Sequence, residues 1–370
     1  MKSILVNTSS RKYKILFGEN IIKNILTFLK EEFPGDNKKI LVSNEKIYGI
    51  YGKRFEDIFS GEADFSSIIL KDGEKYKNID VIKSIYHELI NLNTHRNDIV
   101  ISLGGGVVGD TTGFGAATFN RGMNLVHCPT TIMSQTDSSI GGKTAINFEN
   151  IKNVIGSFYQ PHLIIIDTFF LRTLEEKEII NGLGEIVKYG LVFDYKIIED
   201  LLAIAKECRN NEDRLFEIIR NKKFNDIIYK CAKLKSEIVE KDEFDTGERQ
   251  LLNFGHTIGH ALEKAAGFEM LNHGQAVALG MLCAVEISLS LGMLNMEFKN
   301  ELIKLYEILK LPTHIKNMDQ QKIFDALKFD KKFYSNINKF ILLESVNKPV
   351  IIAGVDEKII KKSIVSYIKQ

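Results

Sequence analysis

The segment 98–114, with the sequence DIVISLGGGVVGDTTGF, restricts the fold of this 370-residue chain more than any other feature. Residues 99–103 are apolar at nearly every position, which is typical of a parallel strand that is covered on both faces. Gly104, Gly106 and Gly109 follow with the spacing G-x-G-x-x-G, and a helical pattern begins directly behind them. A strand that passes through a glycine loop into a helix predicts an α/β domain with a parallel sheet.

The chain divides into two parts with different patterns. In the first part, short β-branched runs alternate with helix-period stretches, here the runs 39–43, 67–70, 124–128 and 163–167 and the stretches 20–32 and 79–92. In the second part, helical periodicity dominates the segments 175–192, 212–241, 251–267, 275–291 and 297–310. We therefore predict a Rossmann-like α/β domain over 1–174 and a mainly helical, all-α domain over 175–370, with a small strand pair at 339–343 and 350–352. Because no Pro-, Gly- or Ser-rich linker separates them, we expect the two domains to pack tightly and share a cleft.

Composition excludes several classes of protein. Hydrophobic residues make up 44% of the chain and charged residues 26%, which is ordinary for a globular protein. Because 49 basic side chains nearly balance 48 acidic ones, we expect neither nucleic acid nor a membrane surface as a partner. Four cysteines without a Cys-x-x-Cys pattern and an N-terminus without an apolar signal segment favour a cytoplasmic location.

The glycine loop is a candidate anion-binding site. Glycines let a pyrophosphate approach the backbone, and a helix N-terminus offers free N–H groups, although a simple tight turn is the alternative interpretation. A second segment, SSIGGKT, is not a P-loop because Asp137 stands where that motif requires glycine. Lys143 in this segment is either an anion contact or a surface lysine in a turn.

Isolated polar side chains stand among apolar neighbours in the second part. Arg249, Asn253, His256 and His260 have the spacing i, i+4, i+7, i+11, which predicts one face of a single α-helix. A buried stripe of this kind is costly unless its members have partners. A functional site would provide such partners.

Three separate apolar segments each carry one possible metal ligand. Glu185, His256 and His273 would form a His₂Glu set, the kind that leaves zinc an open coordination position, although core histidines and helix caps are the alternatives. The pair His256 and His260 also matches H-x-x-x-H, but Thr257 stands where a metalloprotease has its glutamate, which excludes a protease. Cations next to Gly-rich or apolar segments suit a small substrate with phosphate and carboxylate groups. They are Arg121, Lys143, Lys152, Lys188, Lys235, Arg249 and 331–332.

Eight separated motifs give the chain a resemblance to the 3-dehydroquinate synthases along nearly its whole length. They are DGEKYK, GGGVVGDTTGF, CPTTIMSQTDSSIGGKTAIN, KNVIGSFYQP, RTLEEKEIINGLGEIVKYG, LKSEIVEKDE, LLNFGHTIGHALE and NHGQAVALGM. The resemblance implies a phosphorus–oxygen lyase of the shikimate pathway that converts 3-deoxy-D-arabino-heptulosonate 7-phosphate into 3-dehydroquinate and phosphate. It implies oxidation of an alcohol by NAD⁺, β-elimination of phosphate, re-reduction, ring opening and an intramolecular aldol reaction, with the active site in the interdomain cleft.

The resemblance also implies a role for individual residues. Zn²⁺ or Co²⁺ would be bound by Glu185, His256 and His273. NAD would be contacted by Glu74, Lys77, Gly105, Gly106, Val107, Asp110, Thr130, Thr131, Lys152 and Thr173. The substrate phosphate would meet Lys143, Asn153 and Lys332, with Arg121 reaching it from the second subunit of a homodimer, and the carboxylate would meet Lys235 and Arg249. The ring hydroxyls would contact Asp137, Lys188, Asn253 and His260, with His260 as a proton relay.

Two positions depart from the family pattern, and three other functions remain open. Ile151 stands where the family often has glycine, and Gln275 stands where a glutamate would be expected to support His273 from behind, so we expect weaker metal binding. The alternatives are a related sugar phosphate cyclase such as 2-deoxy-scyllo-inosose synthase, a metal-dependent polyol dehydrogenase, and an NAD-binding protein without catalysis. The first is disfavoured because its substrate has no carboxylate to pair with Lys235 and Arg249.

Overall fold

The computed structural model describes residues 1–149, 151–267, 270–328 and 338–369. Contacts between residues divide the chain into two compact units, which we describe one at a time. Unit 1 consists of Met1–Leu174 and Lys235–Asp245, and unit 2 consists of Glu175–Leu234 and Thr246–Gln370. Within the described residues, none of the helices combines the length and the apolar character that crossing a membrane requires.

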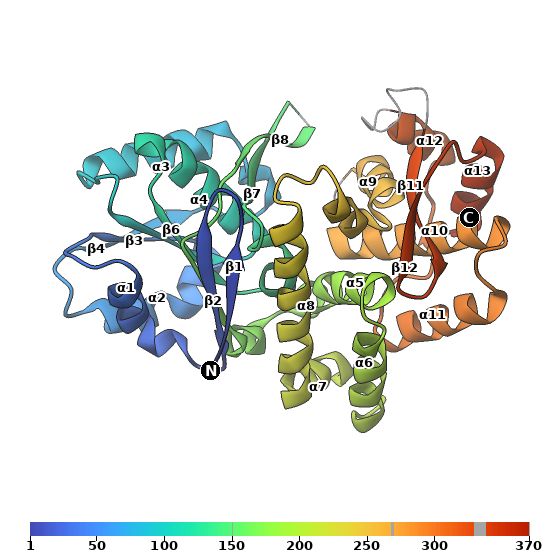
Figure 1. Cartoon of the computed structure of the whole chain (residues 1–370), viewed down its shortest axis with the longest axis horizontal. Coiled ribbons are helices and arrows are strands. Elements are labelled where there is room, and N and C mark those ends of the chain that lie inside the picture. The colour runs from blue at the N-terminus through green and yellow to red at the C-terminus, as the bar shows by residue number, and fades with distance from the viewer. Residues whose placement is uncertain (150, 268–269, 329–337, 370) are drawn as a thin grey trace. The chain divides into compact units, whose positions relative to one another are not determined.

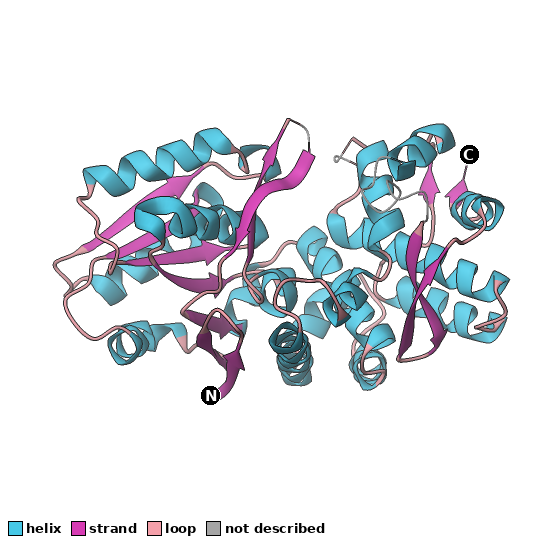
Figure 2. Ribbon diagram, turned by 45° about the horizontal axis from the view of Figure 1, so that its top comes forward, coloured by secondary structure: helices cyan, strands magenta, loops and turns pink. Residues whose placement is uncertain are grey.

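Unit 1 is built on a seven-stranded sheet with the strand order β1-β2-β9-β6-β5-β3-β4 (Figures 1 and 2). The strands are β1 (Lys2–Asn7), β2 (Lys12–Gly18), β3 (Lys39–Asn44), β4 (Phe65–Leu70), β5 (Ile99–Gly104), β6 (Asn124–Pro129) and β9 (Leu163–Asp167). β1 pairs with β2 antiparallel, and the other neighbours pair parallel. This confirms the parallel sheet that the apolar runs predict, whereas the edge hairpin β1–β2 was not predicted.

Helices cover both faces of this sheet. They are α1 (Ile25–Glu32), α2 (Glu45–Phe59), α3 (Ile79–Asn91) and α4 (Gly106–Thr118). Adjacent residues of a strand pack on opposite faces of the sheet. Leu41 of β3 and Ile101 of β5 pack in the core that includes residues of α1 and α2, whereas Val42 of β3 and Val100 of β5 pack in the core that includes residues of α3. Because both faces are buried, the strands are apolar at nearly every position rather than at every second one.

The strand order places the glycine loop at a special point of the sheet. The chain runs from β3 outward to β4 and then returns to β5 on the other side of β3. In open α/β sheets, ligands bind beyond the carboxyl ends of the strands at such a change of direction. The loop that joins β5 to α4 therefore lies where this fold binds its ligands. A separate antiparallel hairpin, β7 (Lys143–Phe148) and β8 (Ile151–Phe158), extends the same unit.

Unit 2 is mainly helical and is centred on one apolar helix, α10 (His273–Ser290), which packs against α5, α9, α11 and α13. The other helices are α5 (Glu176–Val192), α6 (Lys196–Glu207), α7 (Arg214–Arg220), α8 (Lys222–Lys241), α9 (His256–Ala265), α11 (Met296–Ile308), α12 (Gln320–Lys328) and α13 (Glu357–Val365). Two strand pairs complete it, β11 (Lys339–Ser345) with β12 (Lys348–Ala353) and β10 (Ile315–Lys316) with β13 (Ile368–Lys369). The predicted helical character and the predicted strand pair near 339–352 are both confirmed.

The segment Lys235–Asp245 belongs to unit 1 although it lies in the second half of the sequence. It includes the last turns of α8 and is attached through Glu243, whose carboxylate accepts from Ser10 N at 3.0 Å and from Gln160 Nε2 at 2.9 Å. A contiguous division of the chain at one residue therefore does not describe unit 1.

Candidate active site

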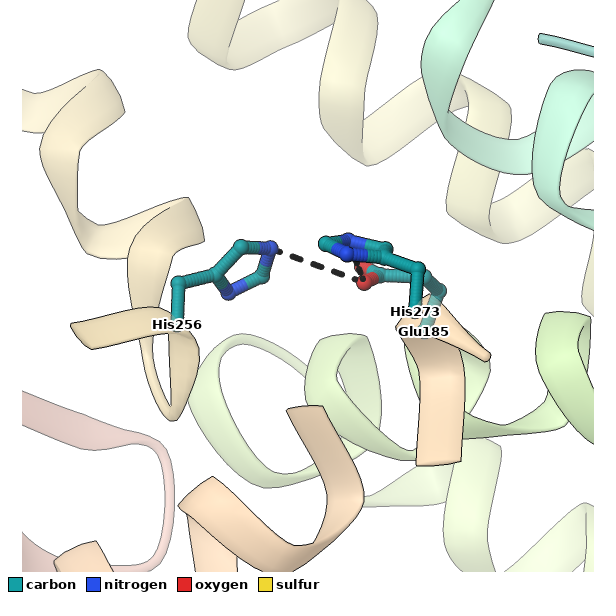
Figure 3. Close-up of side chains that lie close together, drawn as sticks. All are labelled: Glu185, His256 and His273. Carbon is teal, nitrogen blue, oxygen red and sulfur yellow. Dashed lines mark ion pairs between the residues drawn. The ribbon is translucent and has the colours of Figure 1, made fainter. Parts of the chain in front are cut away.

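Three side chains in unit 2 meet at one point (Figure 3). Glu185 comes from the middle of α5, and His256 and His273 are the first residues of α9 and α10. His256 Nε2 lies 3.6 Å from Glu185 Oε1, and His273 Nε2 lies 3.5 Å from the same oxygen. One ligand atom from each residue lies within 4.8 Å of the others. The structure thus brings together the three residues that were predicted to bind metal.

The spacing of these atoms fits a divalent ion. Bonds of ~2.0–2.1 Å in tetrahedral geometry separate two ligand atoms by roughly 3.4 Å. The observed 3.5 and 3.6 Å are close to this value and longer than the roughly 2.7–3.2 Å of an ordinary hydrogen bond. Two imidazoles and one carboxylate are also ligands that zinc and cobalt accept.

Burial and charge act differently on the two histidines of the cluster. Burial, together with the nearby Lys188 ammonium, holds the pKa of His256 well below its usual value. Burial also lowers the pKa of His273, but the carboxylates of Glu185 and Glu263 outweigh this effect and raise it to about 9. Lys188 forms a buried ion pair with Glu185. Because a ligand imidazole must be neutral, a metal that binds here displaces a proton from His273.

The rigid start of α10 fixes the position of His273. Asn272 caps the helix: its Oδ1 accepts from Gln275 N at 2.9 Å, and Gln275 Oε1 accepts from Asn272 N at 3.2 Å. This reciprocal capping box fixes the first helical turn. Gly274 N also donates to Asn181 Oδ1 of α5 at 2.6 Å, which ties α10 to the helix that carries Glu185.

In unit 1, the glycine loop borders a pocket of small residues. Gly105 is the N-cap of α4. A Cβ atom at Gly105 would lie 3.1 Å from Thr131 Cγ2, and one at Gly106 would lie 3.2 Å from Ser138 Oγ. Side chains at these two positions would therefore press against Thr131 and Ser138, so the close packing of the loop favours glycine. The pocket is lined by Ser102, Gly104, Gly105, Gly109, His127, Pro129, Ser134, Ser138 and Ser139.

Several predicted NAD contacts form one network beside this loop. Lys77 Nζ lies 2.5 Å from Asp110 Oδ2 of α4 and 2.5 Å from Asn153 Oδ1 of β8. Glu74 joins it by accepting from Asn147 Nδ2 at 2.8 Å. Burial raises the pKa of Asp110 even though Lys77 opposes the shift. The structure thus connects three predicted NAD contacts with Asn153, a predicted phosphate contact.

The other predicted NAD contacts lie in several different elements of unit 1. Thr130 N donates to Gly104 O at 3.0 Å, directly beside the loop. Thr131 and Ser134 bond through their hydroxyls at 2.8 Å. Thr173 bonds instead to Tyr51 OH at 2.6 Å, away from the Lys77 network. Val107 lies in the first turn of α4 and Lys152 in β8.

Two of the predicted substrate cations of unit 1, Lys143 and Lys235, have acidic or carbonyl partners. Lys143 forms an ion pair with Asp245. Lys235 lies 2.7 Å from Asp137 O and 2.9 Å from Asp137 Oδ1. Arg121 is exposed and has a left-handed backbone with φ 61°. Lys332, the remaining predicted phosphate contact, lies outside the described residues.

Comparison with known families assigns the chain. Residues 67–181 match the family model described as 3-dehydroquinate synthase N-terminal, and residues 182–333 match the one described as 3-dehydroquinate synthase C-terminal. The chain belongs to the 3-dehydroquinate synthase family. A 3-dehydroquinate synthase of Dehalococcoides mccartyi is 40% identical over 100% of this chain and 99% of its own length. Those of Clostridium tetani and Shewanella frigidimarina are 38% and 35% identical, each over 98% of this chain and over 94% and 99% of their own lengths.

Solved structures share the fold of this 3-dehydroquinate synthase family member. A 2-deoxy-scyllo-inosose synthase complexed with carbaglucose-6-phosphate, NAD⁺ and Co²⁺ has a TM-score of 0.84, at 23% identity over 99% of this chain and 100% of its own. The 2-epi-5-epi-valiolone synthase of Streptomyces hygroscopicus with NAD⁺ and Zn²⁺ has a TM-score of 0.87, at 22% identity over 99% of both chains. A glycerol dehydrogenase of Schizosaccharomyces pombe has a TM-score of 0.66, at 17% identity over 95% of this chain and 88% of its own.

One prediction for the family's LLNFGHTIGHALE motif is wrong. Arg249 and Asn253 lie in a separate 3₁₀-helix (Glu248–Asn253), and Gly255 with φ 79° separates it from α9. Only His256 and His260 share a helix, so the four residues are not one continuous helical face. His260 nevertheless remains near the cluster, because its ring centroid lies 5.5 Å from that of His256 and 5.8 Å from that of His273. Arg249 is buried, with 1% of its surface exposed.

The interpretation that position 275 supports His273 from behind is also wrong. Another residue, which the sequence analysis did not identify, lies there. Gln275 takes part in the capping box rather than supporting His273 from behind. The carboxylate beside His273 is Glu263 of α9, whose Oε2 lies 3.2 Å from His273 Nδ1. Sequence reasoning missed Glu263, although its spacing of i+7 from His256 and i+3 from His260 places it near their face of α9.

Proposed function

We propose that this chain is an NAD-dependent 3-dehydroquinate synthase that converts 3-deoxy-D-arabino-heptulosonate 7-phosphate into 3-dehydroquinate and phosphate. The observation that carries the proposal is the cluster of Glu185, His256 and His273 in a chain that matches the family along its full length. Free cysteines at Cys128, Cys208, Cys231 and Cys283 agree with a reducing cytoplasm.

Glu185, His256 and His273 would hold Zn²⁺ or Co²⁺, the ions named in solved structures of the same fold. When bound, the ion supplies Lewis-acid polarisation of the substrate hydroxyl that is oxidised. Lys188 is fixed beside Glu185 by the buried ion pair and has 2% of its side chain exposed. We assign Lys188, Asn253, Asp137 and His260 to the hydroxyl groups of the sugar, with His260 moving a proton because its imidazole lies next to the cluster.

The glycine loop would hold NAD. The first turn of α4 offers backbone N–H groups and the positive end of the helix dipole to the pyrophosphate, and Gly105 and Gly106 have no side chain that would cover the backbone there. We assign Asp110, Lys77 and Glu74 to the hydroxyl groups of the cofactor, because carboxylates and an ammonium group converge there. Val107, Thr130, Thr131, Lys152 and Thr173 complete the proposed cofactor contacts.

The two charged ends of the substrate need separate groups of cations. We assign Lys143, Asn153 and Lys332 to the phosphate, and Lys235 and Arg249 to the carboxylate. Lys235 and Arg249 are buried, with 6% and 1% exposed, which supports the second assignment because charge-assisted hydrogen bonds to a carboxylate are stronger where water is excluded. Exposed Arg121 would reach the phosphate of a second subunit, so we propose a homodimer, which sedimentation would test.

Phosphate release from the heptulosonate phosphate tests this function. Release that requires NAD⁺, stops with a chelator and leaves no net NADH is the expected result, because the hydride is taken and returned in each turnover. Net NADH accumulation would indicate a polyol dehydrogenase instead. Phosphate release from glucose 6-phosphate, but not from the heptulosonate phosphate, would indicate another cyclase of this fold.

A further inference from the structure

We propose that Glu263 is a positioning residue that orients His273 and strengthens it as a metal ligand. The proposal rests on the metal site of the proposed function. Glu263 Oε2 lies 3.2 Å from His273 Nδ1, whereas His273 Nε2, on the other side of the ring, lies 3.5 Å from Glu185 Oε1. The ring of His273 therefore lies between two carboxylates, one at each nitrogen.

The chemistry of a neutral imidazole gives Glu263 its role. If Nε2 donates its lone pair to an ion, Nδ1 must carry the proton, and that N–H needs an acceptor. Glu263 is 3% exposed and supplies a charged acceptor at this position. A carboxylate acceptor fixes the ring orientation and makes the opposite nitrogen a better donor to the ion.

The packing of α9 against α10 holds Glu263 in place. A Cβ atom at Gly259 would lie 3.0 Å from Ala276 O, and one at Gly280 would collide with the carbonyl oxygen of Gly255. The two backbones thus approach as closely as glycine permits. This close approach sets the distance between Glu263, near the end of α9, and His273, at the start of α10.

The second histidine of the cluster provides an internal contrast. His256 Nδ1 lies 3.1 Å from the backbone oxygen of Phe254, which is a neutral acceptor. The two ligand histidines are therefore oriented by different groups. The acceptor of His273 is a side chain that a substitution can remove, whereas the acceptor of His256 is a backbone oxygen that a substitution leaves in place. Loss of such an outer partner typically weakens metal binding by about 10–100-fold.

One competing interpretation uses the same side chains. His260, Glu263 and His273 also place one ligand atom each within 4.8 Å of one another and could hold an ion themselves. If Nδ1 of His273 carries the proton that Glu263 accepts, this nitrogen has no lone pair for an ion at the second group. The two interpretations predict different metal stoichiometries, one ion per chain for the positioning role and two for a second site.

The test measures zinc and cobalt affinity of the full-length protein by competition with a chromophoric chelator. We expect Glu263→Ala to weaken the binding of Zn²⁺ and of Co²⁺ by about 10–100-fold and to alter the visible spectrum of bound Co²⁺. Glu263→Gln keeps an acceptor for the Nδ1 proton and should lose less. Gln275→Glu is the matched control and should leave affinity within about twofold of wild type, because position 275 caps α10.

Several outcomes would overturn the proposal. Unchanged affinity in both Glu263 variants, tighter binding in Gln275→Glu, or loss of one of two bound ions would each contradict it. If Glu263→Ala does not fold, the metal affinity of Glu263→Gln is the test. An affinity equal to that of the wild type would then contradict the proposal. NAD⁺-dependent phosphate release is measured separately, so a wild-type protein that binds one ion tightly but releases no phosphate would refute the proposed function alone.

Discussion

The two units hold their candidate functional residues in different ways. In unit 1 these residues come from loops, strands and helices, and several of their charges are neutralised by other side chains, as in Lys77 with Asp110 and Lys143 with Asp245. In unit 2 the metal-ligand candidates lie on three closely packed helices that converge on Glu185. Unit 1 therefore has pairs that a charged ligand can exchange, whereas unit 2 has a cluster whose geometry is set by the packing of helices.

The comparison predicts its largest effect when one metal ligand is removed from the cluster. We expect His256→Ala to lower NAD⁺-dependent phosphate release by ~1,000-fold, or about 4 kcal/mol, because the ion loses a ligand and its polarising effect. Metal analysis and initial rates provide the measurement. His87→Ala, an exposed histidine on α3, is the control and should change neither. A variant that keeps full metal content and rate would remove the distinction between the units.

The next prediction tests the backbone that positions this cluster. Gly255 has φ 79°, and a Cβ atom there would lie 2.5 Å from Met281 Cγ and 2.8 Å from Val277 O. We expect Gly255→Ala to lower the free energy of unfolding by about 2–5 kcal/mol, as left-handed strain of ~1–2 adds to overpacking of ~1–3. Urea unfolding would measure it.

Gly267→Ala is the matched control for this substitution. Gly267 has φ 66°, but among the described residues nothing lies within 4 Å of the position of its Cβ. Only the left-handed strain of about 1–2 kcal/mol is therefore expected there. Equal losses in the two variants would show that helix packing at Gly255 contributes nothing to stability.

Unit 1 contributes a prediction about pH. Burial lowers the pKa of His127 to about 4, and its Nδ1 lies 2.6 Å from Ser102 Oγ. Since the folded pKa lies below the unfolded value, the unfolded state binds the proton first, and stability falls as pH decreases from ~6.5 towards 4. By pH 5 this histidine should account for a loss of about 2 kcal/mol.

Comparing unfolding of the wild type and His127→Gln at about pH 7.5 and pH 5 isolates this contribution. The glutamine variant should show the smaller decrease in stability, by the same ~2 kcal/mol, while exposed His87→Gln should behave like wild type. If His127→Gln loses as much stability on acidification as the wild type, the residue does not titrate on unfolding.

The sequence predicts the local features of both units better than their long-range contacts. The glycine loop and the buried strands are encoded by adjacent residues, so the strand, loop and helix appear in the structure at the predicted positions. The identity of the metal-ligand candidates follows from isolated polar residues in apolar helices. Hairpins β1–β2 and β7–β8 were missed. In β8 most residues are exposed and leave no clear apolar period.

The missing parts of the site depend on packing and backbone geometry. The spacing of Arg249, Asn253, His256 and His260 fits a helix even though Gly255 interrupts it, because residue spacing carries no information about φ. Glu263 and His273 meet only because α9 and α10 approach closely, which local periodicity does not reveal. Likewise, no local pattern shows that Lys235–Asp245 belongs to unit 1.

The smallest predicted effect concerns an exchangeable pair of unit 1 and rests on the proposed phosphate contact. Lys143 pairs with Asp245, and their side chains are 48% and 18% exposed. Partly exposed pairs of this kind contribute about 0.2–1 kcal/mol, so a substrate phosphate competes with Asp245 for Lys143 at modest cost.

We expect Asp245→Asn to lower the KM for the heptulosonate phosphate by about 2–5-fold with kcat little changed. Asparagine also tolerates the left-handed backbone of residue 245, with φ 59°, so stability should not fall. Asp57→Asn, which breaks an exposed ion pair with Lys53 on α2, is the control. A KM that rises in Asp245→Asn would mean that Asp245 orients Lys143 for phosphate rather than competing for it, and the contrast between exchangeable pairs and a cluster fixed by helix packing would then fail at this residue.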